Sequence, residues 1–246
     1  MARTERPAAL PPDVRPVGQV IAEALRRYGE SFWRVLPLGL PVAVTNQLSA
    51  GRSFWVQVAI LAAATPLLTA AYVGACLLVA KVRVPARVLA RAFGAGLLVI
   101  LPVPVLILFY VLPGLAWLAF VGLVVPVVLV EGMSFRAGFA RAVRLARADY
   151  VHALGALAAA TLVFGVTKIM LILLLRGTAD AAERIALFLA DLVLSPLLFL
   201  VPALVYFDQA ARLVESAPRP RRRRHGDIHP AVESDRARRA DPEVEP

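Results

Sequence analysis

The chain has 246 residues, of which 59% are hydrophobic, and it carries a formal net charge of +10. A soluble domain is usually about 45–50% apolar. The mean hydropathy here is +0.72, so the composition argues against an ordinary soluble enzyme and for a membrane protein. A single cysteine, Cys76, excludes an internal disulfide.

The N-terminal part of the chain is polar. Residues 1–14 are charged and rich in proline, so we expect them to be disordered, and no apolar stretch typical of a signal peptide follows them. Val17–Phe32 repeats apolar residues at helical spacing, with charged residues between them. This pattern predicts an amphipathic helix at the membrane surface.

Six apolar stretches follow, and we expect each of them to cross the bilayer. The expected spans are Val35–Ser49, Phe54–Ala80, Gly94–Val111, Leu115–Val130, Val151–Leu175 and Ile185–Phe207. The first is the shortest and contains Pro37 and Pro41. Together they predict an all-α membrane domain over residues 15–212, arranged as three transmembrane hairpins.

The central hairpin follows from a long uncharged run. No charged residue occurs between Gly94 and Val130. A single helix of this length would extend about 55 Å, whereas the bilayer core is about 30 Å thick. We therefore expect two spans that fold back at Leu112-Pro113-Gly114, because proline cannot continue a helix and glycine accepts a left-handed turn.

A cytoplasmic amphipathic helix is expected before each hairpin. Pro85–Phe93 precedes the second and Ser134–Tyr150 precedes the third. Their arginines share one helical arc each: Arg83, Arg87 and Arg91 for the second segment, and Arg136, Arg141, Arg144 and Arg147 for the third. Two interpretations remain open. The segments are interfacial helices that contact anionic lipid, or they are ordinary connections that obey the positive-inside rule.

Lysine and arginine lie almost entirely on one side of the expected spans. Only Arg52, Arg176 and Arg184 fall on the other side, and Lys168 lies within a span. Because basic residues remain on the cytoplasmic side of inner-membrane proteins, we predict a bacterial inner-membrane protein with both termini in the cytoplasm.

Two charged residues fall inside the expected spans. Lys168 and Asp191 lie at similar distances from the outer ends of the last two spans, so adjacent antiparallel helices would bring them to one depth. An isolated charge in a bilayer costs a few kcal/mol, so we expect them to form an ion pair. The pair is interpreted either as a structural tie or as part of a transport site.

Short motifs at the ends of two expected spans carry a family resemblance. Pro126, Glu131, Gly132 and Ser134 are followed by an arginine-rich segment, and the last span ends in Tyr206-Phe207-Asp208. These motifs resemble those of the membrane domain found with bacterial glycerophosphoryl diester phosphodiesterases, and of its uncharacterised six-span relatives. In this chain Ala142 stands at a usual serine position, and Ala148-Asp149 replaces a usual Lys/Arg-Gly step.

The resemblance implies a membrane module that anchors, scaffolds or assists partners. No soluble stretch is long enough to hold the phosphodiesterase catalytic domain, so no enzymatic activity is implied. Glu131, Tyr206 and Asp208 lie at the expected cytoplasmic ends of their spans. The two carboxylates are expected to accept hydrogen bonds from arginines of the surface helices, Glu131 from an arginine of the third helix or of a neighbouring one.

Residues 213–246 form a tail of basic, acidic and proline residues that is expected to be disordered. Its basic cluster is expected to remain solvated or to contact anionic lipid; it consists of Arg221, Arg222, Arg223 and Arg224. Nucleic-acid binding is disfavoured, because no aromatic residues alternate with these arginines.

No catalytic, cofactor-binding or metal-binding motif is found in the sequence. We therefore predict a structural or accessory membrane protein whose partners are anionic lipids and either another protein or a second copy of the chain. The alternative is a small transporter or permease subunit that uses Lys168 and Asp191. A lipid-modifying enzyme is a more distant third hypothesis.

Overall fold

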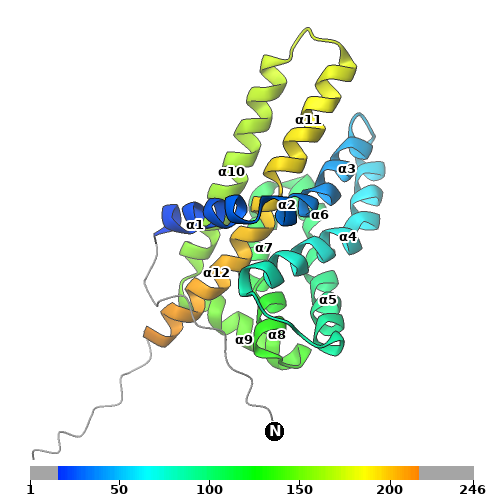
Figure 1. Cartoon of the computed structure of the whole chain (residues 1–246). Helices are drawn as coiled ribbons and strands as arrows, with labels where there is room; N and C mark the ends of the chain where they lie inside the picture. Colours follow the sequence, from blue (N-terminus) through cyan, green and yellow to red (C-terminus); the bar gives the residue numbers. More distant parts are fainter. Residues whose placement is uncertain (1–15, 216–246) are drawn as a thin grey trace, which may run out of the picture. The chain divides into compact units, whose positions relative to one another are not determined.

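The computed structural model describes residues 16–215, and this part of the chain is built from helices, without a strand (Figure 1). In chain order the helices are α1 (Val17–Glu30), α2 (Phe32–Val35), η1 (Leu36–Gly39), α3 (Leu40–Ser49), α4 (Phe54–Ala80), α5 (Ala86–Ile100), α6 (Val103–Phe109), α7 (Val111–Val121), α8 (Val124–Glu131), α9 (Phe135–Ala148), α10 (Tyr150–Leu174), α11 (Asp180–Leu194) and α12 (Pro196–Glu215). The predicted N-terminal disorder and the arginines at 221–224 lie outside the described residues.

Five helical stretches among these residues are long and apolar enough to cross a membrane. They are Phe54–Ala80, Ala86–Phe109, Val111–Glu131, Tyr150–Leu174 and Asp180–Val214. Their outward surfaces are apolar as well: Leu162, Met170 and Leu174 on α10 are each more than half exposed. A helix satisfies its own backbone hydrogen bonds, so such surfaces are compatible with lipid. The described chain therefore has the helical composition of a multi-pass membrane protein.

The first expected span is not a single helix. Residues 32–49 form α2, the short 3₁₀ helix η1 and α3, with Pro37 and Pro41 in the first turns of η1 and α3. Proline lacks the N–H that a continuing helix needs, so each proline begins a new segment. α3 alone has 10 residues and is about 15 Å long, which is too short to span a bilayer.

The central hairpin turns earlier than expected. The chain is extended at Tyr110, with φ −155° and ψ 134°, and α7 begins at Val111. Pro113 and Gly114 therefore lie inside α7, where a proline in the first turn loses no hydrogen bond. α6 packs against α7 and α5 packs against α8, so the two arms of the hairpin lie side by side (Figure 1).

Two of the three expected surface helices are separate helices. α1 and α9 agree closely with the predicted Val17–Phe32 and Ser134–Tyr150. The second expectation is wrong, because α5 begins at Ala86 and continues without a break to Ile100. The segment Pro85–Phe93 is thus the first part of an apolar helix. No proline or glycine turn separates it from the residues that follow.

The last expected span, Ile185–Phe207, consists of two helices. α11 ends at Leu194, and Ser195 precedes Pro196, the first residue of α12. α11 packs on α3, while α12 packs against α4, α10 and α1. The core of the described chain lies around α8 and α12, where Val124–Val128 of α8 and residues such as Leu200 and Val205 are almost inaccessible.

Candidate functional site

Lys168 and Asp191 meet between α10 and α11. The Lys168 Nζ atom lies 2.9 Å from Asp191 Oδ1 and donates a hydrogen bond of 3.0 Å to Oδ2. Asp191 is only 2% exposed, whereas the lysine side chain keeps 22% of its surface accessible. The Phe164 ring lies 5.5 Å from the ammonium and covers it on one side. The pair therefore ties α10 to α11.

A third residue from a distant part of the chain completes this site. Asn46 on α3 donates a hydrogen bond of 2.9 Å from Nδ2 to Asp191 Oδ2. One turn beyond Asp191 along the same interface, Ser195 donates a hydrogen bond of 3.3 Å to the carbonyl of Gly39. Three helices are thus held at a single carboxylate, which offsets its desolvation. Sequence reasoning missed Asn46, because an uncharged amide in a short helix carries no signal of its own.

Glu131 lies at the C-terminal end of α8 and joins two other helices. Tyr206 on α12 donates a hydrogen bond of 3.0 Å to Glu131 Oε1, and the Nε atom of Arg141 on α9 lies 3.3 Å from both carboxylate oxygens. Gly132 follows with φ +67°, a left-handed conformation that suits glycine and turns the chain into α9. The turn brings Arg141, an arginine of the third expected surface helix, back onto Glu131.

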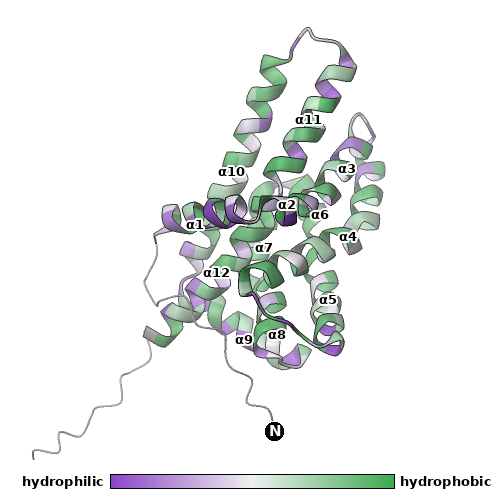
Figure 2. Ribbon diagram, viewed as in Figure 1, coloured by the Kyte–Doolittle hydropathy of each residue, from purple (hydrophilic) through white to green (hydrophobic). Residues whose placement is uncertain are grey.

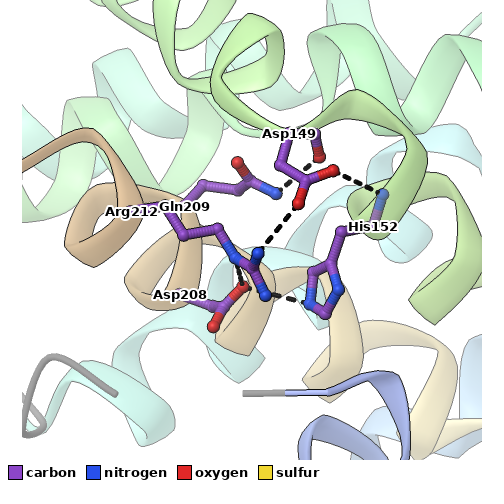
Figure 3. A network of polar contacts seen from close by, with 5 residues as sticks. All are labelled: Asp149, His152, Asp208, Gln209 and Arg212. Atoms are coloured by element: carbon purple, nitrogen blue, oxygen red, sulfur yellow. Dashed lines mark hydrogen bonds and ion pairs between the residues drawn. The ribbon is translucent and has the colours of Figure 1, made fainter. Parts of the chain in front are cut away.

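Asp208 is part of a larger polar network at the same end of α12 (Figure 3). The Nε atom of Arg212 donates a hydrogen bond of 2.8 Å to Asp208 Oδ2, and His152 Nε2 lies 3.1 Å from the same oxygen. The Asp208 side chain is 2% exposed. The arginine that contacts Asp208 thus belongs to its own helix, one turn away, whereas we expected an arginine of a surface helix.

Asp149 connects this network to the junction of α9 and α10. Its Oδ1 accepts a hydrogen bond of 3.0 Å from the backbone N–H of His152, which caps the start of α10. Its Oδ2 lies 2.8 Å from Arg212 Nη1, and its carbonyl accepts a 2.8 Å hydrogen bond from Gln209 (Figure 3). Arg212 therefore bridges two carboxylates, one on each side of the α10–α12 interface.

Asp149, His152, Gln209 and Arg212 were not predicted as site residues. Two local signals were available. Asp208 and Arg212 stand at i and i+4 on one helix face, and Asp149 precedes an apolar helix at the position where aspartate caps. Their meeting depends on the packing of α10 on α12, which neither signal specifies.

The arginines expected to form the cytoplasmic face fall into two groups. Arg141 is bound to Glu131. The other six are exposed and have no carboxylate partner among the described side chains: Arg83, Arg87, Arg91, Arg136, Arg144 and Arg147. The amphipathic helix α1 differs, because Arg26 and Arg27 share Glu23. The hydrogen bond from Arg26 holds the pKa of Glu23 below its ordinary value.

Most of the buried charged side chains in the described residues contact one another. Among residues 16–215, no three His, Cys, Asp or Glu side chains gather in a way that could hold a metal ion. A small apolar pocket of about 100 Å³ lies between α1, α10 and the α11–α12 junction, and neither Lys168 nor Asp191 lines it. The ionised groups described above face one another, as expected of ties between helices.

Comparison of the chain with protein-family models, with curated proteins and with solved structures finds no match. The resemblance to the phosphodiesterase-associated membrane domain therefore stays a prediction, and functional inference depends on the residues of this chain.

Proposed function

We propose that this chain is an integral protein of the bacterial inner membrane with a structural or accessory role, and that both termini face the cytoplasm. The observation that supports this best is the mutual pairing of its buried charges. Asp191 binds Lys168, Asp208 binds Arg212, and neither carboxylate faces an apolar pocket that could admit a substrate. Between helices, Lys168 and Asp191 tie α10 to α11, and Arg212 ties α12 to Asp149 at the start of α10, as expected of charges with a structural role.

We propose six membrane crossings, the five candidate spans and one further crossing formed by α2, η1 and α3. α2, η1 and α3 together supply 18 residues, which correspond to about 27 Å of helix, close to the thickness of the bilayer core. α3 lies along both α4 and α11, two helices that are part of candidate spans. A crossing made of short, proline-separated pieces is tolerated where protein neighbours satisfy the freed backbone groups.

The family resemblance supports the same role. Glu131 and Tyr206, two of the residues that carry it, contact each other and so tie α8 to α12. A membrane domain of this kind would act by holding lipids, another protein or a second copy of itself. The proposal accordingly assigns no enzymatic activity to the chain.

One observation favours the alternative of a small transporter or permease subunit. Asp191 is a carboxylate buried inside a candidate span, and intramembrane charges of this kind often mark ion pathways. The Lys168 side chain keeps part of its surface accessible, so the protein does not enclose the pair completely.

A flux measurement separates the two functions. The full chain is reconstituted into liposomes that contain a pH-sensitive dye, and proton, sodium and potassium gradients are applied in turn. The accessory role predicts no protein-dependent flux. A flux that is lost in Asp191→Asn but kept in Thr167→Val, a control on the exposed side of α10, would establish the transporter and overturn our proposal.

A second measurement tests the accessory role directly. Gently solubilised from its native membrane, the full chain should migrate as an assembly heavier than one 26.5 kDa chain with its detergent. Multi-angle light scattering separates protein mass from detergent mass. A particle that contains a single chain, without a bound protein or second copy, contradicts the scaffold.

A further inference from the structure

We propose that six exposed arginines without a carboxylate partner among the described residues, one just before α5, two on α5 and three on α9, form a binding surface for the phosphate headgroups of anionic phospholipids, with two phenylalanines of α9 set beside them in the acyl region. We call this the basic surface; it consists of Arg83, Arg87, Arg91, Arg136, Arg144 and Arg147. The inference rests on the proposed role in the membrane and names the lipid that this end of the protein holds.

The first step is the charge balance at this end of the bundle. Figure 2 shows hydrophilic residues gathered around α9 and the first turns of α5. The nearby carboxylates are already bound: Glu131 by Arg141, and Asp149 and Asp208 by Arg212. The positive charge of the basic surface is therefore not neutralised by the described part of the chain. A surface of this kind attracts anionic lipid headgroups.

The second step is the orientation of α9, which tight packing determines. Gly138, Ala142 and Leu145 are buried on its inner side. A Cβ at Gly138 would overlap the Val128 side chain of α8, so the two helices approach closely. At 100° per residue this places Arg136 and Arg147 on the outer side of α9, and it leaves α9 little freedom to roll.

The third step is the pair of aromatic rings on one flank of α9. Phe135 and Phe139 are 40% and 39% exposed, and their ring centroids lie 6.4 Å apart. Between a buried inner side and an arginine-bearing outer side, such rings match the arrangement of an interfacial helix, in which aromatic side chains enter the acyl boundary and cations meet the headgroups. Acidic proteins and nucleic acids would use the arginines but would leave the two rings in water. Lipid is therefore the partner that uses both features.

The first experiment measures lipid preference. The purified full chain in nonionic detergent is titrated with phosphatidylglycerol or with phosphatidylcholine of the same acyl chains, and bound lipids are counted by native mass spectrometry. We expect tighter binding of phosphatidylglycerol, weakened by raising the salt concentration. Equal binding of the two lipids overturns the proposal, as does displacement of phosphatidylglycerol by millimolar inorganic phosphate, which would indicate a site for small anions.

Matched variants locate the site. We expect the triple variant Arg136→Gln, Arg144→Gln and Arg147→Gln to bind phosphatidylglycerol about 100-fold more weakly, since each surface charge contributes about fivefold. The control triple Arg52→Gln, Arg176→Gln and Arg184→Gln removes the same charge from exposed arginines in the α3–α4 and α10–α11 regions and should bind as the natural chain does. Equal losses in the two triples would show that only net charge matters, and would overturn the proposal.

Two further variants separate lipid binding from folding. The triple variant Arg136→Lys, Arg144→Lys and Arg147→Lys should keep most of the phosphatidylglycerol preference that the glutamine triple loses. Thermal unfolding without lipid should stay unchanged in both glutamine triples. The double variant Phe135→Ala, Phe139→Ala should bind both lipids more weakly, by a similar factor. Unchanged binding of both lipids would overturn the role of the rings. A loss of lipid preference with an intact protein assembly would refute this inference alone and leave the proposed scaffold standing.

Discussion

Asp191 shows how strongly one residue can depend on a partner far away in the chain. Its carboxylate is almost fully withdrawn from solvent, and it is neutralised by Lys168 and hydrogen-bonded by Asn46, which lies 145 residues earlier. Removing one member of a buried pair leaves an unpaired charge, whereas replacing both members leaves none. The cost of a substitution here therefore depends on which residues are changed together.

We expect Lys168→Asp and Asp191→Lys, each alone, to lose about 3–5 kcal/mol of stability and to accumulate poorly, because each places two like charges together. The double swap should restore most of the protein level. Membrane-fraction immunoblots and thermal unfolding in detergent measure both quantities. Single variants that accumulate normally would show that the pair is not a structural tie.

The Glu131 carboxylate is partly exposed, so its ion pair should contribute less to the stability of the protein than the buried pair of Lys168 and Asp191 does. Glu131→Gln should lower the free energy of unfolding by about 1 kcal/mol, because the ion pair with Arg141 is lost while the amide oxygen can still accept from Tyr206. A double-mutant cycle with Arg141→Gln, measured by SDS titration in mixed micelles, isolates the pair. A coupling energy of zero, or a Glu131→Gln protein as stable as the natural chain, would contradict the assigned tie.

At the scale of helices, proline and glycine decide where the segments of this chain begin and how closely they pack. Pro37, Pro41 and Pro196 each lie at or near the start of a helix, whereas Pro66 and Pro202 lie inside long ones. Proline alone therefore does not specify a break. At Gly39 the absence of a side chain allows η1 to lie directly on the backbone of α11.

Gly39→Ala should separate η1 from α11, since its Cβ would overlap the Leu192 carbonyl and contact Pro196. We expect a loss of about 1–3 kcal/mol, measured as a lower thermal unfolding midpoint. Gly29→Ala is the matched control, because a Cβ at Gly29 in α1 has no neighbour within 4 Å, and it should be neutral or slightly stabilising. Equal midpoints for the two variants would mean that the α3–α11 side of the bundle does not need this close approach.

The whole molecule is organised by an asymmetry of charge. The basic surface lies on α9, on α5 and on the connection just before α5, while the connections around Ser53 and Thr178 carry few arginines. In an inner membrane this asymmetry predicts orientation, because basic segments are not translocated. The five candidate spans are long and apolar enough to cross the membrane, and the position of the arginines predicts which end of each span faces the cytoplasm.

Cysteine labelling in intact cells tests this orientation. In a Cys76→Ala background, which removes the one buried thiol, a membrane-impermeant maleimide should label Ser53→Cys and Thr178→Cys from outside. Ser134→Cys, in the exposed turn before α9, should react only after permeabilisation. Labelling of Ser134→Cys in intact cells, with Ser53→Cys protected, would reverse the predicted orientation.

Much of the fold could be predicted from the sequence, because apolar length and charge are properties of consecutive residues. The uncharged run from Gly94 to Val130 predicts a helical hairpin, and Val151–Leu175 agrees with α10 to within one residue at each end. The turn at Tyr110 and the continuous α5 were not predicted. Those boundaries depend on the packing of neighbouring helices, which can override local propensity.

The sequence by itself determined that this protein is helical, strongly apolar and basic on one side, and it identified Lys168, Asp191 and Glu131 as charges in need of partners. Only the tertiary structure decided which partners they have. Asn46 reaches Asp191 and Arg212 bridges Asp149 to Asp208 because α3 packs on α11 and α10 packs on α12. A buried charge must be compensated, but the sequence alone does not specify which distant helix supplies the compensation.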